Sequence, residues 1–155
     1  MQRTVVLIKP DGLQRGLVGE IMHRFERKGL KIIGIKMIRL TDEILENWYV
    51  HHKDKAFFKD LKSFMEWTPV VAMVWEGLDA IAAVRKIVGI TKAREAEAGS
   101  IRGDFGMSGS QNIIHASDSE ESAQKEMGLI FNGDEIFEYD SAMDLLIYSK
   151  EEAEK

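Results

Sequence analysis

A chain of 155 residues with 45% hydrophobic and 30% charged residues has the size and composition of one ordinary globular domain. Its net charge of −5 argues against nucleic-acid binding, because affinity for a phosphate backbone comes mainly from clustered Lys and Arg side chains. With no cysteine, no secretory signal and no apolar run near the roughly 20 residues of a membrane span, the simplest expectation is a cytoplasmic protein without disulfides or thiolate chemistry.

The start of the chain alternates between strand and helix patterns. The β-branched segment Arg3–Ile8 predicts a buried strand, and the turn residues Lys9-Pro10-Asp11-Gly12 end it. Apolar residues at helical spacing over Leu17–Phe25 predict an amphipathic helix with Gly29 as its C-cap. The isoleucine-rich segment Lys31–Leu40 is expected to form a second strand.

Two helical patterns come next. Thr41 is a natural N-cap for a helix that continues through Tyr49, and apolar residues then recur at helical spacing from Phe57 to Met65. An aromatic stripe of this kind is more often core than a ligand platform. Because Phe57 and Phe58 are adjacent, however, only one of them can face the core fully, and the other is a candidate for stacking on a base.

A third strand and a third crossover follow. Val70–Trp75 is continuously apolar and predicts a strand, and the segment from Leu78 to Gly89 predicts a helix. Arg85 falls on the apolar face of that helix, where it needs an anionic partner or must reach out to solvent. The long glycine-rich segment Thr91–Ser110 is expected to be a loop, and loops of this length in compact domains are often functional.

The last elements complete a recognisable order. Ser117-x-x-Glu120 matches a capping box and predicts a helix from Asp118 to about Leu129, followed by a tail whose acidic end at 150–155 should fray. Without its insertions the order is βαββαβ. We therefore expect one α/β (α+β) domain over residues 1–155: a ferredoxin-like sandwich with a four-stranded antiparallel sheet, helices on one face, a long inserted loop and a C-terminal extension.

His115 is the strongest candidate for chemistry. It lies between an apolar step and a helix N-terminus, where backbone N–H groups favour an anion and hold an imidazole neutral. Neutral imidazole is a nucleophile, so a phosphohistidine could form there. The alternative is a structural histidine near a strand end. The nearby Arg102, Asn112, Ser117 and Glu126 favour the functional interpretation, and Glu126 could orient one ring nitrogen while the other attacks.

Other standard signatures are missing from the sequence. It contains no P-loop, GxGxxG, GxSxG or HExxH pattern. His51 and His52 are adjacent and should point apart, so we expect no metal held by protein ligands alone. Lys9, at the end of a buried strand, could present its ammonium to a ligand, and a solvated lysine is an equal alternative when the residue is considered alone.

The segment from Asn112 to Ser119, Asn-Ile-Ile-His-Ala-Ser-Asp-Ser, resembles the active-site signature of the nucleoside diphosphate kinases. The resemblance extends through Thr4–Gly19, Phe57-Phe58, Pro69–Gly77 and Ile101–Phe105, and covers nearly the whole chain without a shift in register. It implies a ping-pong exchange in which ATP or another nucleoside triphosphate phosphorylates the histidine. A nucleoside diphosphate then accepts the phosphoryl group at the same site.

The resemblance also implies which residues bind the nucleotide. Phe57 would stack on the base, with Leu61 beneath it. Lys9 would contact the sugar and the phosphates, and Asn112 a sugar hydroxyl. The β- and γ-phosphates would be held by Arg85, Thr91 and Arg102. Stacking on one aromatic face is indifferent to base identity, so we expect broad specificity among nucleosides.

The same resemblance assigns the residues around the transferred group. Tyr49 would lie near that group, and Ser117 and Glu126 would hold His115. The expected cofactor is Mg²⁺, bound through the nucleotide phosphates, with Asp118 at most an outer-shell partner. Phosphoryl transfer needs positioning and charge neutralisation above all, and two arginines, a lysine and a metal ion supply both.

Two departures from the family pattern bear on backbone and assembly. Ala116 stands where relatives commonly have glycine, and the segment Lys92–Ser100 lacks the prolines that relatives usually carry, so its loop should be less pre-ordered. In the family this loop builds subunit contacts. A homo-oligomer is expected, with a hexamer favoured over a tetramer because the chain continues past its final helix as hexameric members do.

A non-catalytic ferredoxin-like binding or scaffold module is the alternative function. An RNA-binding module would need a basic, aromatic sheet face with a Gly-Phe-rich motif, and the sequence has neither. A catalytically inactive scaffold is disfavoured because the expected site residues are all present: Lys9, Arg85, Arg102, Asn112 and His115.

Overall fold

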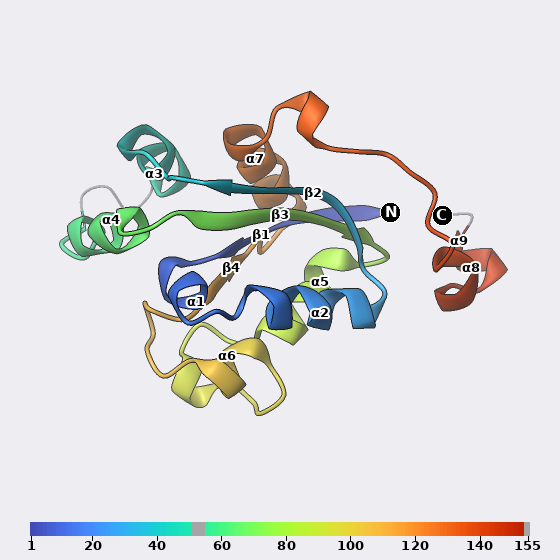
Figure 1. Ribbon diagram of the computed structural model, residues 1–155, viewed down its shortest axis with the longest axis horizontal. Helices are drawn as coiled ribbons and strands as arrows, with labels where there is room; N and C mark the ends of the chain where they lie inside the picture. Colours follow the sequence, from blue (N-terminus) through green and yellow to red (C-terminus); the bar gives the residue numbers. More distant parts are fainter. Residues whose placement is uncertain (51–54, 154–155) are drawn as a thin grey trace.

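The computed structural model describes residues 1–50 and 55–153, and its centre is a four-stranded sheet in the order β2-β3-β1-β4 (Figure 1). The strands are β1 (Gln2–Ile8), β2 (Lys31–Ile38), β3 (Val70–Gly77) and β4 (Ile114–Ala116). Every neighbouring pair is antiparallel. The predicted ferredoxin-like α+β architecture is therefore confirmed, with the short β4 at one edge carrying the candidate histidine beside β1.

One face of the sheet is covered by the crossover helices α2 (Val18–Lys28) and α5 (Ala80–Val88), with the short α1 (Pro10–Gln14) beside them (Figure 1). Trp75 and Phe25 meet there with ring centroids 5.2 Å apart. Each large apolar side chain buried in this layer contributes about 1.5–3 kcal/mol relative to exposure. Helix α2 ends at Gly29, whose φ of 95° is the left-handed C-cap expected from the sequence.

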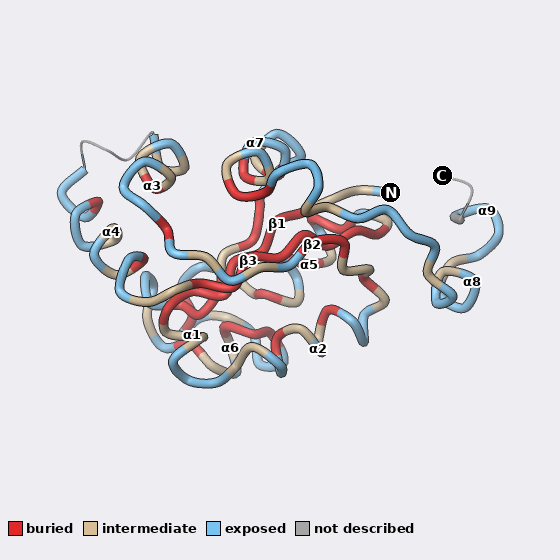
Figure 2. The backbone as a smooth tube through the Cα atoms, turned by 45° about the horizontal axis from the view of Figure 1, so that its top comes forward, coloured by how far each residue is buried: buried red, intermediate tan, exposed pale blue. Residues whose placement is uncertain are grey.

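The other face of the sheet carries α3 (Asp42–Trp48), α4 (Phe58–Glu66) and α7 (Glu120–Ile130). Their apolar residues Leu45, Met65 and Ile130 belong to a second core cluster with Val74 of β3. The expectation of helices on one face thus describes only α2 and α5. The sequence of β3 explains why helices lie on both faces. This strand is apolar at six consecutive positions and buried along its whole length (Figure 2), as is typical of a strand covered on both sides.

Two local expectations were wrong. Lys9-Pro10-Asp11-Gly12 does not form a simple turn, because Pro10 opens the short helix α1 at a position where its missing N–H is not needed. Ser117 does not cap α7. The cap is Ser119, whose side chain accepts a hydrogen bond from the N–H of Ser122, since the hydroxyl of Ser117 is engaged elsewhere.

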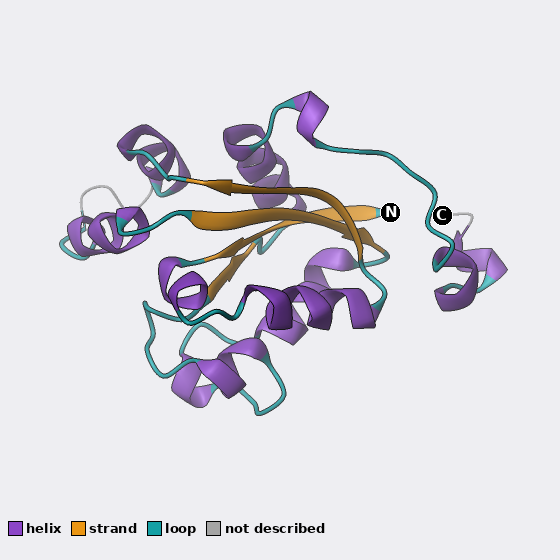
Figure 3. Cartoon of the chain, viewed as in Figure 1, coloured by secondary structure: helices purple, strands orange, loops and turns teal. Residues whose placement is uncertain are grey.

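The remaining short elements lie in loops and in the tail (Figure 3). They are η2 (Ala93–Glu95), α6 (Ile101–Phe105), η3 (Gly133–Glu135), α8 (Asp144–Ile147) and α9 (Lys150–Ala153). The long segment expected to be a loop thus contains α6, which Ser100 caps by accepting from the N–H of Gly103. Residues 154–155 of the expected frayed end, and the adjacent histidines 51 and 52, lie outside the described residues.

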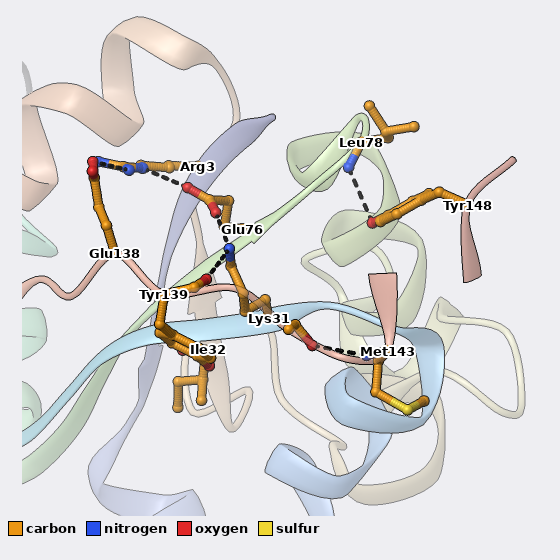
Figure 4. Close-up of polar contacts among 10 residues, drawn as sticks. Arg3, Lys31, Ile32, Glu76, Leu78, Glu138, Tyr139, Met143 and Tyr148 are labelled. Atoms are coloured by element: carbon orange, nitrogen blue, oxygen red, sulfur yellow. Dashed lines mark hydrogen bonds and ion pairs between the residues drawn. The ribbon is translucent and has the colours of Figure 1, made fainter. Parts of the chain in front are cut away.

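The C-terminal extension is bound to β2 and to the start of β1 by hydrogen bonds and an ion pair. The N–H of Phe137 donates to the carbonyl oxygen of Ile33 at 2.8 Å. The hydroxyl of Tyr139 donates to the carbonyl oxygen of Ile32 at 2.6 Å. Arg3 pairs with Glu138 of the extension at 3.0 Å, and Lys31 donates to the carbonyl of Tyr139 at 3.1 Å. Both cations also pair with Glu76 of β3, each at 2.8 Å (Figure 4). Among the described residues, no helix is both long and apolar enough to cross a bilayer.

Candidate active site

A cavity of about 770 Å³ lies where the ends of β1 and β4 meet α3, α4 and α7. Side chains from widely separated parts of the sequence line it. The predicted site residues among them are Lys9, Tyr49, Phe57, Leu61, Arg85, Thr91, Arg102, Asn112, His115 and Glu126. Ser117 is fully buried behind this wall instead of lining it. The fold therefore gathers at one place the residues that the sequence placed in one site.

His115 is held by a buried carboxylate. Its Nε2 atom lies 2.9 Å from Oε1 of Glu126, and Ser117 donates its hydroxyl to the other carboxylate oxygen at 2.6 Å. Ser117 also accepts the N–H of Val5 at 3.0 Å. An ionised carboxylate can only accept hydrogen bonds, so the hydrogen of a neutral imidazole must be on Nε2. This tautomer leaves the lone pair on Nδ1.

Two aromatic side chains at the end of α3 complete the surroundings of the histidine. The rings of Trp48 and His115 are 5.1 Å apart and nearly perpendicular at 85°, and Trp48 is stacked on Tyr49 at 6.4 Å. The pKa of Tyr49 rises to about 12 because of burial and, second, the negative charge of Glu126. Tyr49 therefore keeps its hydroxyl hydrogen at neutral pH and can donate it.

Trp48 was missed by the sequence reasoning. It lines the cavity beside Tyr49, yet in the sequence it is only one residue of the helix expected after Thr41. The one feature that could have predicted its role is its position directly before Tyr49, a candidate site residue, at the end of a helix. Nothing in the local pattern showed that this helix end would lie against β4.

The ammonium of Lys9 is almost completely buried. It donates to Oδ1 of Asn112 at 2.7 Å and to the carbonyl of Ser110 at 3.3 Å. Burial, and then repulsion from Arg102, lowers its pKa from 10.5 to about 8, although Asp11 acts in the opposite direction. Among the described residues its hydrogen bonds go to neutral groups, so the buried ammonium is prepared for an anion.

Arg102 is fixed by backbone carbonyls. Its guanidinium donates to Gly89 at 2.9 Å, to Ile114 at 2.7 Å and to Asn112 at 3.3 Å. Burial and the nearby charge of Arg85 lower its pKa to about 10. Among the described residues Arg102 forms no ion pair with a carboxylate, so its charge remains available to an anionic ligand.

Asn112 is oriented by three partners. Its Nδ2 donates to the carbonyls of Thr91 at 2.9 Å and Gly109 at 3.0 Å, while Oδ1 accepts from Lys9. Both N–H groups of the amide are thereby used, and Oδ1 retains one lone pair. The amide can therefore accept one further hydroxyl from a ligand.

The adjacent phenylalanines take different positions, as expected. Phe58 is 7% exposed and belongs to the interior, whereas Phe57 is 49% exposed and lines the cavity together with Leu61. Phe57 is also the N-cap residue of α4, so its ring is carried at the helix start rather than in a packed row. An exposed aromatic at a cavity wall offers a face to a planar ligand.

The cavity is lined by both cations and carboxylates. In the described part of the chain, no three His, Asp or Glu side chains are grouped to hold a metal ion. Asp118 lines the cavity, and its pKa is lowered by hydrogen bonds from Ser122 and Ser119 and by the charge of Arg85, although burial opposes this. A hard cation such as Mg²⁺ would fit as an ion carried by ligand phosphates, with Asp118 able to contact its water shell.

In this ferredoxin-like fold, one cavity contains an oriented histidine, two arginines and a lysine. These side chains indicate an enzyme that acts on phosphate groups rather than a module that binds ligands on its sheet surface. The family model described as nucleoside diphosphate kinase matches residues 2–136. The chain belongs to the nucleoside diphosphate kinase family, and it is an enzyme that transfers phosphoryl groups between nucleotides. The alternative of a non-catalytic module is not favoured.

Individual relatives agree over nearly the full length. The nucleoside diphosphate kinase of Parabacteroides distasonis is 49% identical over 152 residues, which are 98% of this chain and 99% of the relative. That of Staphylothermus marinus is 55% identical over 138 residues, 89% of this chain and 98% of the relative.

Solved structures give the same result for the fold. A halophilic nucleoside diphosphate kinase from Halobacterium salinarum in complex with CDP has a TM-score of 0.93 at 45% identity, covering 96% of this chain and 99% of that one. A family protein from Babesia bovis has a TM-score of 0.92 at 47% identity, covering 96% and 100%.

Proposed function

We propose that the phosphoryl group passes through Nδ1 of His115 in a ping-pong exchange. The observation that carries this proposal is the hydrogen bond between Nε2 of His115 and Glu126, because it leaves the lone pair on Nδ1. That lone pair forms a bond to the γ-phosphorus of a nucleoside triphosphate. The bond from this phosphorus to the β–γ bridging oxygen breaks, and the oxygen keeps the electron pair as the diphosphate leaves.

The second half-reaction reverses the first with another nucleotide. A terminal oxygen of an acceptor diphosphate attacks the phosphorus, and the N–P bond returns its electrons to Nδ1. While phosphorylated, the imidazole carries additional positive charge, which the buried carboxylate of Glu126 offsets. Ser117 keeps that carboxylate in place through its 2.6 Å hydrogen bond, and is in this sense a positioning residue.

We assign the other lining residues to the nucleotide by their chemistry. Phe57 stacks on the base with Leu61 beneath it, and the remaining lone pair of Asn112 accepts a sugar hydroxyl. Lys9 reaches the sugar and phosphates, and Tyr49 donates near the transferred group. The β- and γ-phosphates meet Arg85, Thr91 and Arg102. The CDP bound to the halobacterial relative supports a nucleotide in this cavity.

Mg²⁺ is the proposed cofactor, carried on the nucleotide phosphates with Asp118 as an outer partner. When bound it supplies charge neutralisation at the β- and γ-phosphates. The cavity itself supports this assignment, because its cations suit the phosphates of a nucleotide.

The proposed enzyme is one catalytic domain, located in the cytoplasm and assembled as a hexamer rather than a tetramer. Exposed apolar side chains support an assembled state: Ile35 and Met37 on the edge strand β2, and Leu145 and Leu146 on α8. Light scattering of the purified protein separates a hexamer from a tetramer, and cell fractionation tests the location.

The chemical proposal is tested by incubating the protein with γ-labelled ATP. We expect acid-labile, base-stable label on the protein, and loss of that label when GDP is added. His115→Ala should abolish labelling, while His23→Ala, which changes an exposed histidine of α2, should leave it intact. Absence of label, or labelling and turnover by the His115→Ala variant, would show that the phosphohistidine mechanism is wrong.

A further inference from the structure

Ile113 has a backbone conformation that its side chain disfavours. Its φ is 73°, and among the described residues only Asp79 is another non-glycine residue with positive φ. A β-branched residue in this region is a genuine outlier, which persists only when surrounding contacts enforce it. Ile113 follows Asn112 and is two residues before His115, so the outlier lies within the candidate active site.

Contacts from Lys9 and Asp11, just after β1, hold this conformation from both sides. The N–H of Ile113 donates to Oδ2 of Asp11 at 3.0 Å, and the carbonyl of Ile113 accepts the N–H of Lys9 at 2.8 Å. The side chain of Ile113 is fully buried in the core. Asp11 is 102 residues away in the sequence, so this hydrogen bond ties the two halves of the site together.

The neighbouring peptide groups depend on the same conformation. Arg102 donates to the carbonyls of Asn112 and Ile114, which flank the outlier on either side. Rotation of the backbone at Ile113 would displace both acceptors. The same conformation also requires glycine at position 12, because a Cβ on Gly12 would lie 2.9 Å from the carbonyl oxygen of Ile113.

The charge of Asp11 favours the ammonium of Lys9, but that effect does not account for its hydrogen bond to Ile113. The second carboxylate oxygen of Asp11, Oδ1, is buried and has no hydrogen-bond partner among the described residues. A buried polar atom without a partner is costly, and such atoms occur where another role keeps the group in place. The hydrogen bond to Ile113 is a role of this kind.

We propose that Asp11 is a positioning residue, which stabilises the strained backbone at Ile113 and thereby sets Asn112 and His115 against the nucleotide. This inference rests on the proposed function, in which His115 is phosphorylated. In-line transfer is sensitive to small displacements, and a misplacement of 1 Å can cost about a hundredfold in rate.

The first test is a matched pair of variants of similar size. Asp11→Asn retains an oxygen that can accept the N–H of Ile113, whereas Asp11→Leu removes the acceptor. For Asp11→Leu we expect kcat to fall on the order of tenfold to a hundredfold, with a smaller change in KM. Asp11→Asn should retain most of the native kcat. Equal kcat values for the two variants would overturn the proposal.

The second test removes the strain itself. Glycine adopts positive φ without steric cost, so in an Ile113→Gly background the removal of Asp11 should matter less. We expect the fold loss in kcat from Asp11→Leu, or from Asp11→Ala if the leucine variant folds poorly, to be several times smaller in that background than in the native chain. The same fold loss in both backgrounds would contradict a role through Ile113.

A structural measurement separates this inference from the exchange mechanism. Hydrogen exchange at the N–H of Ile113 should be slow in the native protein and in Asp11→Asn, and faster in Asp11→Leu at temperatures well below unfolding. Unchanged protection in Asp11→Leu would refute the positioning role even if His115 is phosphorylated. A native protein that takes no label from ATP would instead refute the proposed function, whatever the exchange shows.

Discussion

The Nε2 atom of His115 lies 2.9 Å from Oε1 of Glu126, so the histidine is oriented by a carboxylate that is itself buried. Glu126 comes from α7 and His115 from β4, eleven residues apart, and the turn between them contains Ser117. This arrangement selects one tautomer before any nucleotide binds. Preorganisation of this kind lowers the barrier without further rearrangement during the reaction.

Glu126→Gln should slow phosphorylation of His115. An amide can present an N–H to Nε2, which permits the wrong tautomer, and it cannot offset the positive charge of the phosphorylated ring. We expect kcat to fall by about 10–100-fold, the range known for carboxylates that orient metal-bound histidines, with a smaller change in KM. Stopped-flow measurement of a single phosphorylation step checks this. A rate equal to that of the native protein would mean that the carboxylate does not set the tautomer.

Activity should decline in alkaline solution because of Lys9. Its pKa of about 8 lies below the ordinary 10.5, so the ammonium loses its proton, and with it its attraction for phosphates, as pH rises through 8. The decline should appear in kcat/KM, which reports the free enzyme. Lys9→Gln should have lower activity throughout and should lack this alkaline limb. A limb that persists in the variant would assign the titration to another group.

Trp48 should restrict the ring of His115. The χ2 torsion of a histidine is broad, so the hydrogen bond to Glu126 leaves some freedom that the perpendicular indole at 5.1 Å reduces. Loss of such a ring pair is worth about 0.5–1.5 kcal/mol, so Trp48→Ala should lower kcat by about 2–12-fold, and Trp48→Phe by less. Trp67→Ala, at an exposed position outside the cavity, is the control and should leave kcat unchanged.

Phe57→Ala should raise KM for all nucleotides to a similar degree. Stacking of a base on an aromatic ring is worth about 1–3 kcal/mol and does not depend on base identity. Steady-state assays with ADP, GDP, CDP and UDP as acceptors test this expectation. Phe58→Leu should behave differently, lowering the thermal midpoint with little effect on KM, because that ring is buried. A large KM change for one base alone would argue against simple stacking.

The ion pairs that Glu76 forms with Arg3 and Lys31 should weaken in acid. Burial favours the neutral form of Glu76, but hydrogen bonds from Lys31 and Arg3 outweigh it and hold the pKa below the ordinary 4.5. Glu76 therefore contributes stability above pH 4.5 that is lost as pH falls through the lower, folded-state pKa. Glu76→Gln should reduce the slope of unfolding free energy against pH in that range. Denaturant titrations at pH 3 to 6 provide the measurement.

Much of the fold followed from local pattern. The apolar run Val70–Trp75, the helical spacing after Leu17 and Gly29 as a C-cap are short-range signals, because period and propensity act between near neighbours. Ser117 shows the limit of such signals. Its spacing to Glu120 matched a capping box, yet in the fold its hydroxyl bonds Val5 and Glu126, leaving the cap to Ser119. A tertiary partner outcompeted the local one.

By itself the sequence indicated the four strands, the main helices and the candidate histidine, since these follow from residue type and spacing. The family resemblance implied the set of cations around that histidine. Only the tertiary structure decided that Asp11 holds the backbone of Ile113 and that Trp48 lies against His115. Contacts between segments tens of residues apart depend on how whole elements pack. No local periodicity encodes that packing.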